Sequence, residues 1–178
     1  NTKRMKVNIF KEIKFGKEVF IPKHYDENSF VMDWTMEAGG KVPPHFHKYA
    51  DEHFKINKGE ILFTVNGQKM LKKQGEELFV PKGIVHTLSN SGKGQVHVTV
   101  TYSPCADSHR FFEIMATLDD KNTGSPNNII KYFYLAPRLG LKEFSTPGSA
   151  FVLSILNGLT SIMGKMLGWN KLIDKFKV

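Results

Sequence analysis

The sequence predicts a mainly β protein, a sandwich or barrel of short strands with helices at its C-terminal end. Up to Tyr102 the chain is a series of short apolar runs separated by turn residues, which is the pattern of a β sandwich or barrel. Asn66-Gly67 lies between two such runs and predicts a hairpin, because both residues tolerate positive φ. Beyond Tyr102 the apolar residues recur at helical spacing. We therefore divide the chain into a barrel over residues 1–106 and a helical extension over residues 107–178.

Nine strands are predicted from apolar or alternating runs that turn residues bound. In chain order they cover residues 6–10, 18–22, 30–36, 52–57, 60–65, 68–71, 77–80, 85–89 and 96–102.

Three helical runs follow the strands. Asp107 or Ser108 is suited to cap the first, which carries Phe111, Met115 and Leu118 on one face. The second covers residues 128–135 and stops at Pro137, and the third begins at Thr146-Pro147 and keeps its apolar period to Met166.

The net charge of +8 is concentrated at the two ends of the chain. Residues 1–24 and residues 131–178 each carry seven basic and two acidic residues, whereas residues 25–130 carry eleven basic and thirteen acidic ones. Only three of the 25 basic residues are Arg, the residue type favoured for bidentate base and phosphate contacts. No basic motif is interleaved with aromatic residues. We therefore predict a lysine-rich solvated surface and no nucleic-acid partner.

The cysteine content and the longest apolar segment bear on location. Cys105 is the single cysteine, which excludes an internal disulfide framework, and no signal-peptide pattern is seen, so we expect a cytoplasmic protein. The apolar segment 150–163 has 14 residues, short of the roughly 20 that a membrane-spanning helix needs. Gly164 and Gly168 are four residues apart, a spacing that lets helices approach closely. We expect this helix to pack on the barrel or across a dimer rather than on a membrane.

The histidine-rich stretch PPHFHKYADEHFKINKGE, residues 43–60, divides by strand parity. His45 and His47 are two residues apart, so on an extended backbone both side chains point to the same face. In the following strand Glu52 shares its parity with the apolar Phe54, which marks the buried side. His53 has the opposite parity and is expected at the surface. Glu52 is therefore a carboxylate that faces the core.

A carboxylate that points into a barrel is unfavourable unless something compensates it. A divalent metal is the natural compensation, and His86, which shares its parity with Leu88, is a further inward group. Three imidazoles and one carboxylate suit one divalent transition metal such as Fe, Mn, Co, Ni, Cu or Zn and do not meet the oxygen preference of Ca or Mg. The candidate metal ligands are His45, His47, Glu52 and His86.

The spacing of these residues resembles the two sequence motifs of the cupin family. The first motif is a glycine, five residues, His-x-His, three or four residues, Glu, six residues and a glycine, filled here by Gly39, His45, His47, Glu52 and Gly59. The second is a glycine, five residues, Pro-x-Gly, two residues, His, three residues and Asn, filled here by Gly75, Pro81, Gly83, His86 and Asn90. Every motif position is filled. The helical extension resembles the tail of a group of bacterial cupin-domain proteins.

The resemblance covers about residues 28–104 and implies a cupin-type β-barrel, also called a double-stranded β-helix or jelly roll. It implies that the four candidate ligands hold a metal inside one end of the barrel and that a small molecule is the substrate. A dioxygenase, in which Glu52 also acts as the catalytic base, is the leading expectation. A metal-dependent isomerase or lyase and a non-enzymatic small-ligand-binding cupin are the alternatives. Cupins commonly form dimers, so we expect a homodimer.

Other side chains carry weaker signals. His97 alternates with apolar valines and is expected outside the barrel. Core packing is favoured over a substrate pocket for Trp34 and Phe63. Asp51 is either a group at the edge of the site or an ordinary loop residue. Cys105 has no adjacent histidine in the sequence, so no nucleophile is predicted there.

Overall fold

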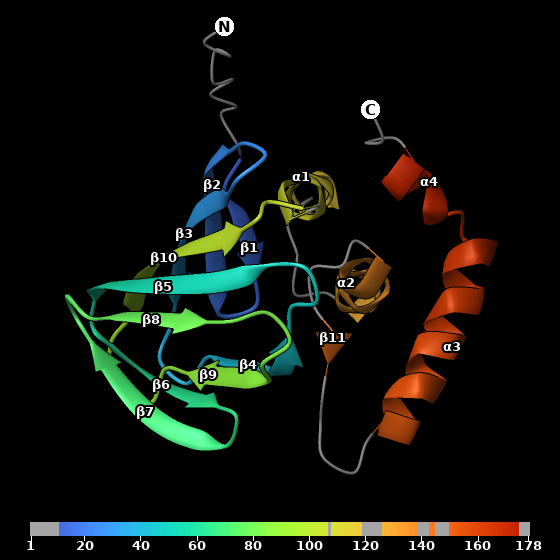
Figure 1. Ribbon diagram of the computed structural model, residues 1–178. Helices are drawn as coiled ribbons and strands as arrows, with labels where there is room; N and C mark the ends of the chain where they lie inside the picture. Colours follow the sequence, from blue (N-terminus) through green and yellow to red (C-terminus); the bar gives the residue numbers. More distant parts are fainter. Residues whose placement is uncertain (1–10, 107, 119–125, 139–142, 145–149, 175–178) are drawn as a thin grey trace, which may run out of the picture.

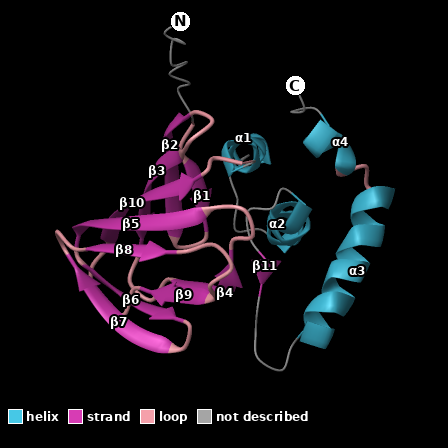
Figure 2. Ribbon diagram, viewed as in Figure 1, coloured by secondary structure: helices cyan, strands magenta, loops and turns pink. Residues whose placement is uncertain are grey.

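A computed structural model describes residues 11–106, 108–118, 126–138, 143–144 and 150–174 (Figure 1). Its strands form two sheets that pack face to face, and the helices lie together at one side of the barrel (Figures 1 and 2). The predicted mainly β class with C-terminal helices is confirmed.

The first sheet has the order β1-β2-β3-β10-β5-β8 and its paired strands are antiparallel. Along β3 and β10 every second residue is buried, as expected for strands with one face on the core. The members are β1 (Ile13–Phe15), β2 (Glu18–Tyr25), β3 (Phe30–Met36), β5 (Asp51–Lys58), β8 (Glu77–Val80) and β10 (Val96–Ser103).

The second sheet has the order β11-β4-β9-β6-β7 and is also antiparallel. Asn66 and Gly67 join β6 to β7 with φ values of 48° and 80°, so the predicted hairpin with positive φ at both turn residues is confirmed. The members are β4 (Lys41–Phe46), β6 (Glu60–Val65), β7 (Gln68–Lys73), β9 (His86–Ser89) and β11 (Glu143–Phe144).

Eight of the nine predicted strands are present within a few residues, and the ninth, residues 6–10, lies outside the described residues. β4 was not among the predicted strands, because Pro43-Pro44 argues against a strand. The pairing of β4 with β9 shifts register between Val42 and His45. The two prolines lie in this irregular section. Regular strand pairing is interrupted there, so their lack of an N–H group costs no hydrogen bond between strands.

The helices are α1 (Ser108–Leu118), α2 (Pro126–Arg138), α3 (Ala150–Met166) and α4 (Asn170–Asp174). The first packs on β1 and β2: the Phe112 ring lies 5.4 Å from that of Phe20 and 5.2 Å from that of Phe30. Of the predicted helix face, Phe111 is buried. Asp107, Thr146-Pro147 and the side chains of Met115 and Leu118 lie outside the described residues. The second helix continues through Pro137 to Arg138, one residue past its predicted stop.

Gly164 lets α3 approach α2 closely, as the sequence predicted. A Cβ atom at this position would lie 2.3 Å from Cε2 of Tyr134, which is far inside contact distance. Gly168 has a different role, because its φ of +69° and the bond from the Trp169 N–H to the Gly164 carbonyl, 2.8 Å, terminate the helix. Within the described part of the chain, no helix has the length and apolar character needed to cross a membrane.

A pair of Gly→Ala substitutions on α3 tests this close approach. Gly158→Ala has open space around the new methyl group and should stabilise the protein by about 0.5–1 kcal/mol, since alanine favours a helix interior. Gly164→Ala must displace the Tyr134 side chain and should destabilise the protein by about 1–3 kcal/mol. Urea unfolding followed by circular dichroism measures both. Equal effects of the two substitutions would contradict the packing of α3 on α2.

Candidate metal centre

Four buried polar side chains from both sheets converge at one place in the barrel. His45 lies in β4, His47 directly follows β4, His86 begins β9, and Glu52 comes from β5 in the opposite sheet. Each offers one ligand atom, these atoms all lie within 4.8 Å of one another, and the residues are only 1–3% exposed. The four residues that strand parity and the motif spacing selected are therefore together in the structure.

Backbone carbonyls orient two of the imidazoles. Nδ1 of His45 lies 2.8 Å from the Pro43 carbonyl oxygen, and Nδ1 of His86 lies 3.0 Å from that of Ile84. A carbonyl oxygen only accepts, so each Nδ1–H donates to it, and Nε2 is the ring nitrogen that faces the cluster. Such bonds fix ring orientation in metal sites of known proteins.

The spacing of the ligand atoms fits a transition metal. Nε2 of His47 and Nε2 of His86 each lie 2.9 Å from Oε2 of Glu52. Two ligand atoms bound at right angles, each about 2.1 Å from one metal ion, would lie about 3 Å apart. The donor set and its geometry therefore suit a divalent transition metal, without rearrangement of these three groups.

The electrostatics of the cluster favour an ionised Glu52. Burial raises the pKa of this carboxyl group, but attraction to His47 and hydrogen bonds with His47 and His86 hold its pKa well below the ordinary value. Glu52 is therefore a carboxylate at neutral pH. Because the folded-state pKa is depressed, this interaction stabilises the fold above the ordinary carboxyl pKa and is lost as the pH falls through the lower folded value.

Two backbone N–H groups tie the second motif to the first. The Lys82 N–H donates to Oδ1 of Asp51 at 2.8 Å, and the Gly83 N–H donates to the His47 carbonyl at 2.8 Å. Asp51 therefore holds the turn that precedes His86 against the strand that carries Glu52. This contact decides between the two sequence interpretations of Asp51 in favour of a group that supports the site.

The last residue of the second motif, Asn90, has a structural role. Its side chain is 1% exposed and donates to the carbonyls of Met36, at 3.0 Å, and Gly94, at 2.7 Å. Its Oδ1 accepts from the Gly92 N–H at 3.0 Å. Asn90 thus closes the loop between β9 and β10 and supplies no ligand to the cluster.

The outward prediction for two other histidines is confirmed. The His53 side chain is 40% exposed, and its Nε2 lies 3.0 Å from Oε2 of Glu77 on the outer face of the first sheet. His97 lies between buried valines of β10, and its Nε2 is 3.0 Å from Oε1 of Gln95. Neither joins the cluster.

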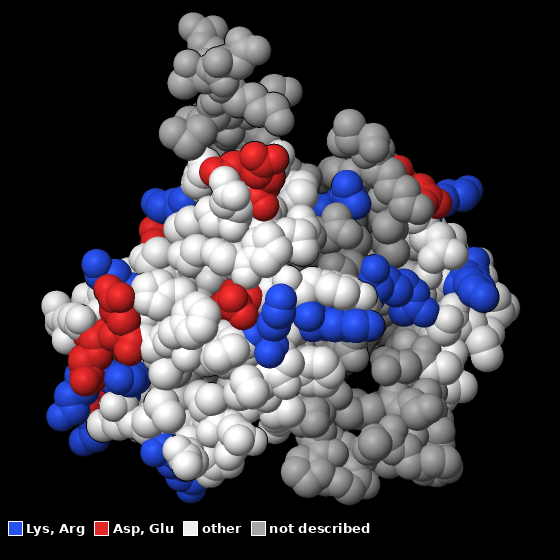
Figure 3. All heavy atoms as spheres, viewed as in Figure 1, with Lys and Arg blue, Asp and Glu red and all other residues white. Residues whose placement is uncertain are grey.

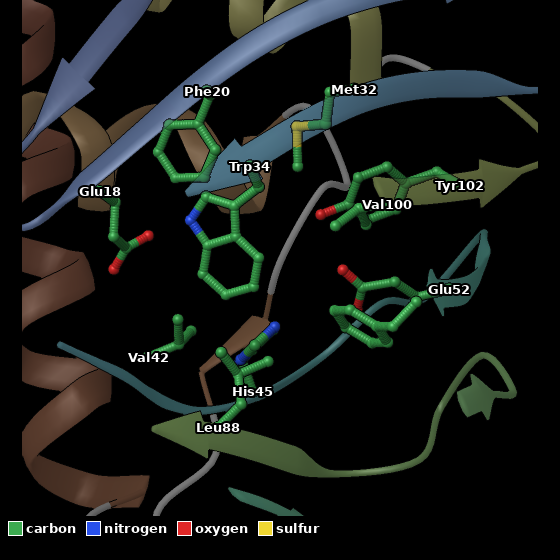
Figure 4. Close-up of a pocket in the computed structure, with 11 residues that line it drawn as sticks. Glu18, Phe20, Met32, Trp34, Val42, His45, Glu52, Leu88, Val100 and Tyr102 are labelled. Atoms are coloured by element: carbon green, nitrogen blue, oxygen red, sulfur yellow. The ribbon is translucent and has the colours of Figure 1, made fainter. Parts of the chain in front are cut away.

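A cavity of about 20 Å³ lies beside the cluster, bounded by both sheets (Figure 4). This volume has room for the centres of one or two water molecules. Most of its walls are apolar. The lining residues are Glu18, Phe20, Met32, Trp34, Val42, His45, Glu52, Phe54, Leu88, Val100 and Tyr102.

Two cavity residues differ from the sequence expectation. Trp34 is buried, as predicted, but it also lines the cavity, whereas Phe63 is fully buried core. Glu18 was not selected from the sequence at all. Its parity with Phe20 in the predicted strand 18–22 was the available signal that this carboxylate faces inward.

Cys105 has a histidine neighbour that sequence adjacency did not reveal. Sγ of Cys105 lies 3.3 Å from Nδ1 of His109, four residues along the chain at the start of α1, and the His109 ring stacks on Tyr25 at 4.2 Å. The turn into α1 thus brings together two side chains that are four residues apart in the sequence.

Comparison with known families agrees with the two motifs and the fold. The family model described as the cupin domain matches residues 32–102, the segment that supplies all four residues of the cluster. Residues 32–102 form a cupin domain. The double-stranded β-helix that the resemblance implied is thereby confirmed for this part of the chain.

The relatives and solved structures match only part of this chain. Oxalate oxidase 1 from Hordeum vulgare is 32% identical over 73 residues, 36% of this chain and 36% of its own length, so the chain spans about a third of this relative. Among solved structures, KdgF from Halomonas sp. superimposes with a TM-score of 0.53 at 15% identity, over 56% of this chain and 91% of that one. An RmlC-like cupin from Shewanella frigidimarina gives a TM-score of 0.51 at 14% identity, over 61% and 92%. These structural likenesses establish the fold.

Replacing Asn90 separates structural support from ligation. Asn90→Ala leaves buried carbonyls without their donor and should lower the free energy of unfolding by about 2–3 kcal/mol. Asn57→Ala is the matched control, because the Asn57 side chain lies at the surface, and the hydrogen bond described for it joins it to Thr99 at 2.7 Å. This substitution should lower the free energy of unfolding by less than about 0.5 kcal/mol. Guanidinium unfolding measures both. An unchanged stability of Asn90→Ala would refute the structural role.

Proposed function

We propose that this protein is a metal-dependent cupin enzyme of the dioxygenase type that acts on a small organic molecule. His45, His47, Glu52 and His86 hold one divalent transition metal, Fe, Mn, Ni, Co, Cu or Zn. The observation that supports this most directly is the ionised, buried Glu52 carboxylate with two imidazole nitrogens 2.9 Å from one of its oxygens. Such a buried charge is stable only with a cation or proton donors around it.

The metal, when bound, supplies a Lewis acid and, for a redox-active ion, electron transfer to and from dioxygen. The chain supplies the remaining functions. The bonds from Nδ1 of His45 and His86 to backbone carbonyls hold the imidazoles in place, and the apolar walls keep bulk water from the cavity. Glu52 faces the same cavity as a carboxylate, so it is the group placed to accept a proton from a substrate there.

The likeness to oxalate oxidase 1 supports oxygen-dependent chemistry over the alternatives, although it covers 36% of this chain. An isomerase or lyase would use the same four residues with the metal as Lewis acid alone. Conversion of a substrate without oxygen consumption would assign the protein to that second class. Binding without conversion would assign it to the non-enzymatic ligand-binding cupins.

Metal content tests the assignment of the four ligands. Protein purified without a nickel column and loaded with Zn²⁺ should hold about one equivalent per chain. His86→Ala should lose most of this metal, because it removes one donor and leaves Glu52 poorly compensated. His53→Ala is the matched control and should keep its metal, since His53 lies on the outer face. Wild-type protein that takes up no metal, or His53→Ala that loses it, would overturn the assignment.

Oxygen uptake tests the reaction and the role of Glu52. Iron- or manganese-loaded protein should consume O₂ with aromatic or enediol compounds in an oxygen-electrode assay. Glu52→Gln should lower the rate by about 10²–10⁴-fold, the range for loss of a general base, with a smaller loss of metal. Equal losses of metal and activity would make Glu52 a ligand alone.

The assembly and location of the protein stay predictions. Leu159, Ile162 and Met166 lie at intervals of three and four on α3 and are each more than half exposed, so this face is the one we propose for a homodimer. In the face drawn in Figure 3, Lys and Arg form several separate groups, some of them beside Asp or Glu, which supports a solvated surface without a nucleic-acid partner. The single cysteine supports a cytoplasmic location.

A further inference from the structure

A cysteine and a histidine meet at the start of α1, outside the metal centre. Cys105 lies in the link from β10 to α1 (Figure 1), and its carbonyl accepts the Ser108 N–H at 3.0 Å. Its Sγ is 3.3 Å from Nδ1 of His109, the second residue of α1, so the sulfur lies at the first turn of the helix. The His109 ring stacks on Tyr25, with centroids 4.2 Å apart and planes 17° from parallel. This stack holds the imidazole against the sulfur.

The position of the sulfur favours the thiolate form of Cys105. An imidazole in contact with a thiol can take up its proton and form an ion pair with the thiolate. The first turn of a helix also stabilises negative charge close to it. Because the thiolate is the nucleophilic form of cysteine, His109 gives Cys105 the proton acceptor that a reactive cysteine needs.

The pair lines a cavity of about 420 Å³, far larger than the one of about 20 Å³ beside the metal cluster. It has room for a small molecule. Cys105 is only 3% exposed, so this cavity is the route to its sulfur, and bulky reagents are disfavoured. The lining residues are Tyr25, Asp26, Glu27, Cys105, Ala106 and His109.

Two carboxylates in the wall restrict the charge of a reagent. Hydrogen bonds from the backbone N–H groups of Ser29, at 2.9 Å, and Asn28, at 2.8 Å, lower the pKa of Asp26, which is therefore ionised at neutral pH. Glu27 is exposed. Solvent screens both charges, so they oppose a thiolate less than His109, in direct contact, favours it. An anionic reagent would be repelled by these carboxylates and by the thiolate itself, so a small neutral electrophile is favoured.

We propose that Cys105 is a peroxide-reactive thiol that His109 activates. The thiolate attacks one oxygen of hydrogen peroxide, an S–O bond forms and the O–O bond breaks. The departing hydroxide takes the proton held on His109 and leaves as water. The sulfur is oxidised by two electrons to a sulfenic acid while the peroxide is reduced. Cys105 is the only cysteine of the sequence, so a small thiol from solution would return it to the reduced form. This site is independent of the metal centre.

Alkylation by iodoacetamide, a small neutral reagent, tests the thiolate, and each adduct reports on the single cysteine. Below its pKa of about 8.5 a free thiol reacts about tenfold more slowly for each pH unit. Full-length protein unfolded in urea should show this fall between pH 7 and pH 6. Folded wild-type protein should slow less than about threefold, because His109 holds the proton. Mass spectrometry of timed samples measures the rates.

Two histidine variants of the folded protein separate activation from mere burial. His109→Asn removes the proton acceptor and should restore the tenfold fall between pH 7 and pH 6. His24→Asn is the matched control and should behave as the wild type, because Nε2 of His24 lies 3.4 Å from Oδ2 of Asp26 but His24 does not line the cavity. Folded wild-type protein that reacts more slowly than unfolded protein at pH 6 would show an inert buried thiol and overturn the proposal. Equal profiles of wild type and His109→Asn would overturn it as well.

Trapping with dimedone, which reacts with sulfenic acids, tests the oxidation itself. After brief exposure to hydrogen peroxide at pH 7, wild-type protein should carry one dimedone adduct, and His109→Asn should carry about tenfold less adduct at the same time. Oxidised glutathione, which is bulky and anionic, should modify folded wild-type protein at least about tenfold more slowly than unfolded protein. Equal dimedone labelling of wild type and His109→Asn would assign the oxidation to a route without His109 and refute the activation.

Discussion

One ionised carboxylate buried between two sheets is the constraint on which the rest of the site depends. Glu52 comes from the first sheet and the three histidines from the second, so the charge is compensated only if the sheets pack in one arrangement. Glu52 lies opposite Tyr102 of β10 and Val80 of β8. A slip of one residue along β5 would bring His53 inside and turn Glu52 to solvent, and the cluster would be lost.

The link between the two motifs follows from the same constraint. His86 is 34 residues beyond Glu52 in the chain, but the bonds from Lys82 to Asp51 and from Gly83 to the His47 carbonyl fix the turn before it. Gly83 adopts a φ of +80° in that turn, a conformation that costs other residues free energy. Gly83 of the second motif thus permits a backbone hydrogen bond to His47 of the first motif. The spacing of the two motifs therefore reflects backbone contacts as well as candidate ligands.

Local patterns were sufficient to predict the four-residue cluster, whereas the composition of the cavity beside it depends on long-range contacts. Parity alone placed Glu52 inside and His53 outside, because one face of β5 is buried along most of its length. The strand that carries His45 was missed, since its two prolines obscure the pattern. Trp34 was assigned to the core from its type, and only the fold shows that Glu18, on a neighbouring strand, lines the same cavity. The order of the strands depends on the whole sheet, so neighbouring strands cannot be predicted from one short stretch of sequence.

The cupin match includes the four residues of the cluster but only part of the cavity beside them. Residues 32–102 include all four residues of the cluster and Trp34, whereas Glu18 and Phe20 lie before this segment. The extension also contacts two strands that contribute to the cavity. Phe112 of α1 packs on Phe20, and β11 pairs with β4 so that Phe144 lies opposite His45. The walls of the cavity are therefore built partly from residues that the family model does not cover. The cupin match accounts for the four residues of the cluster and for only part of the cavity beside them.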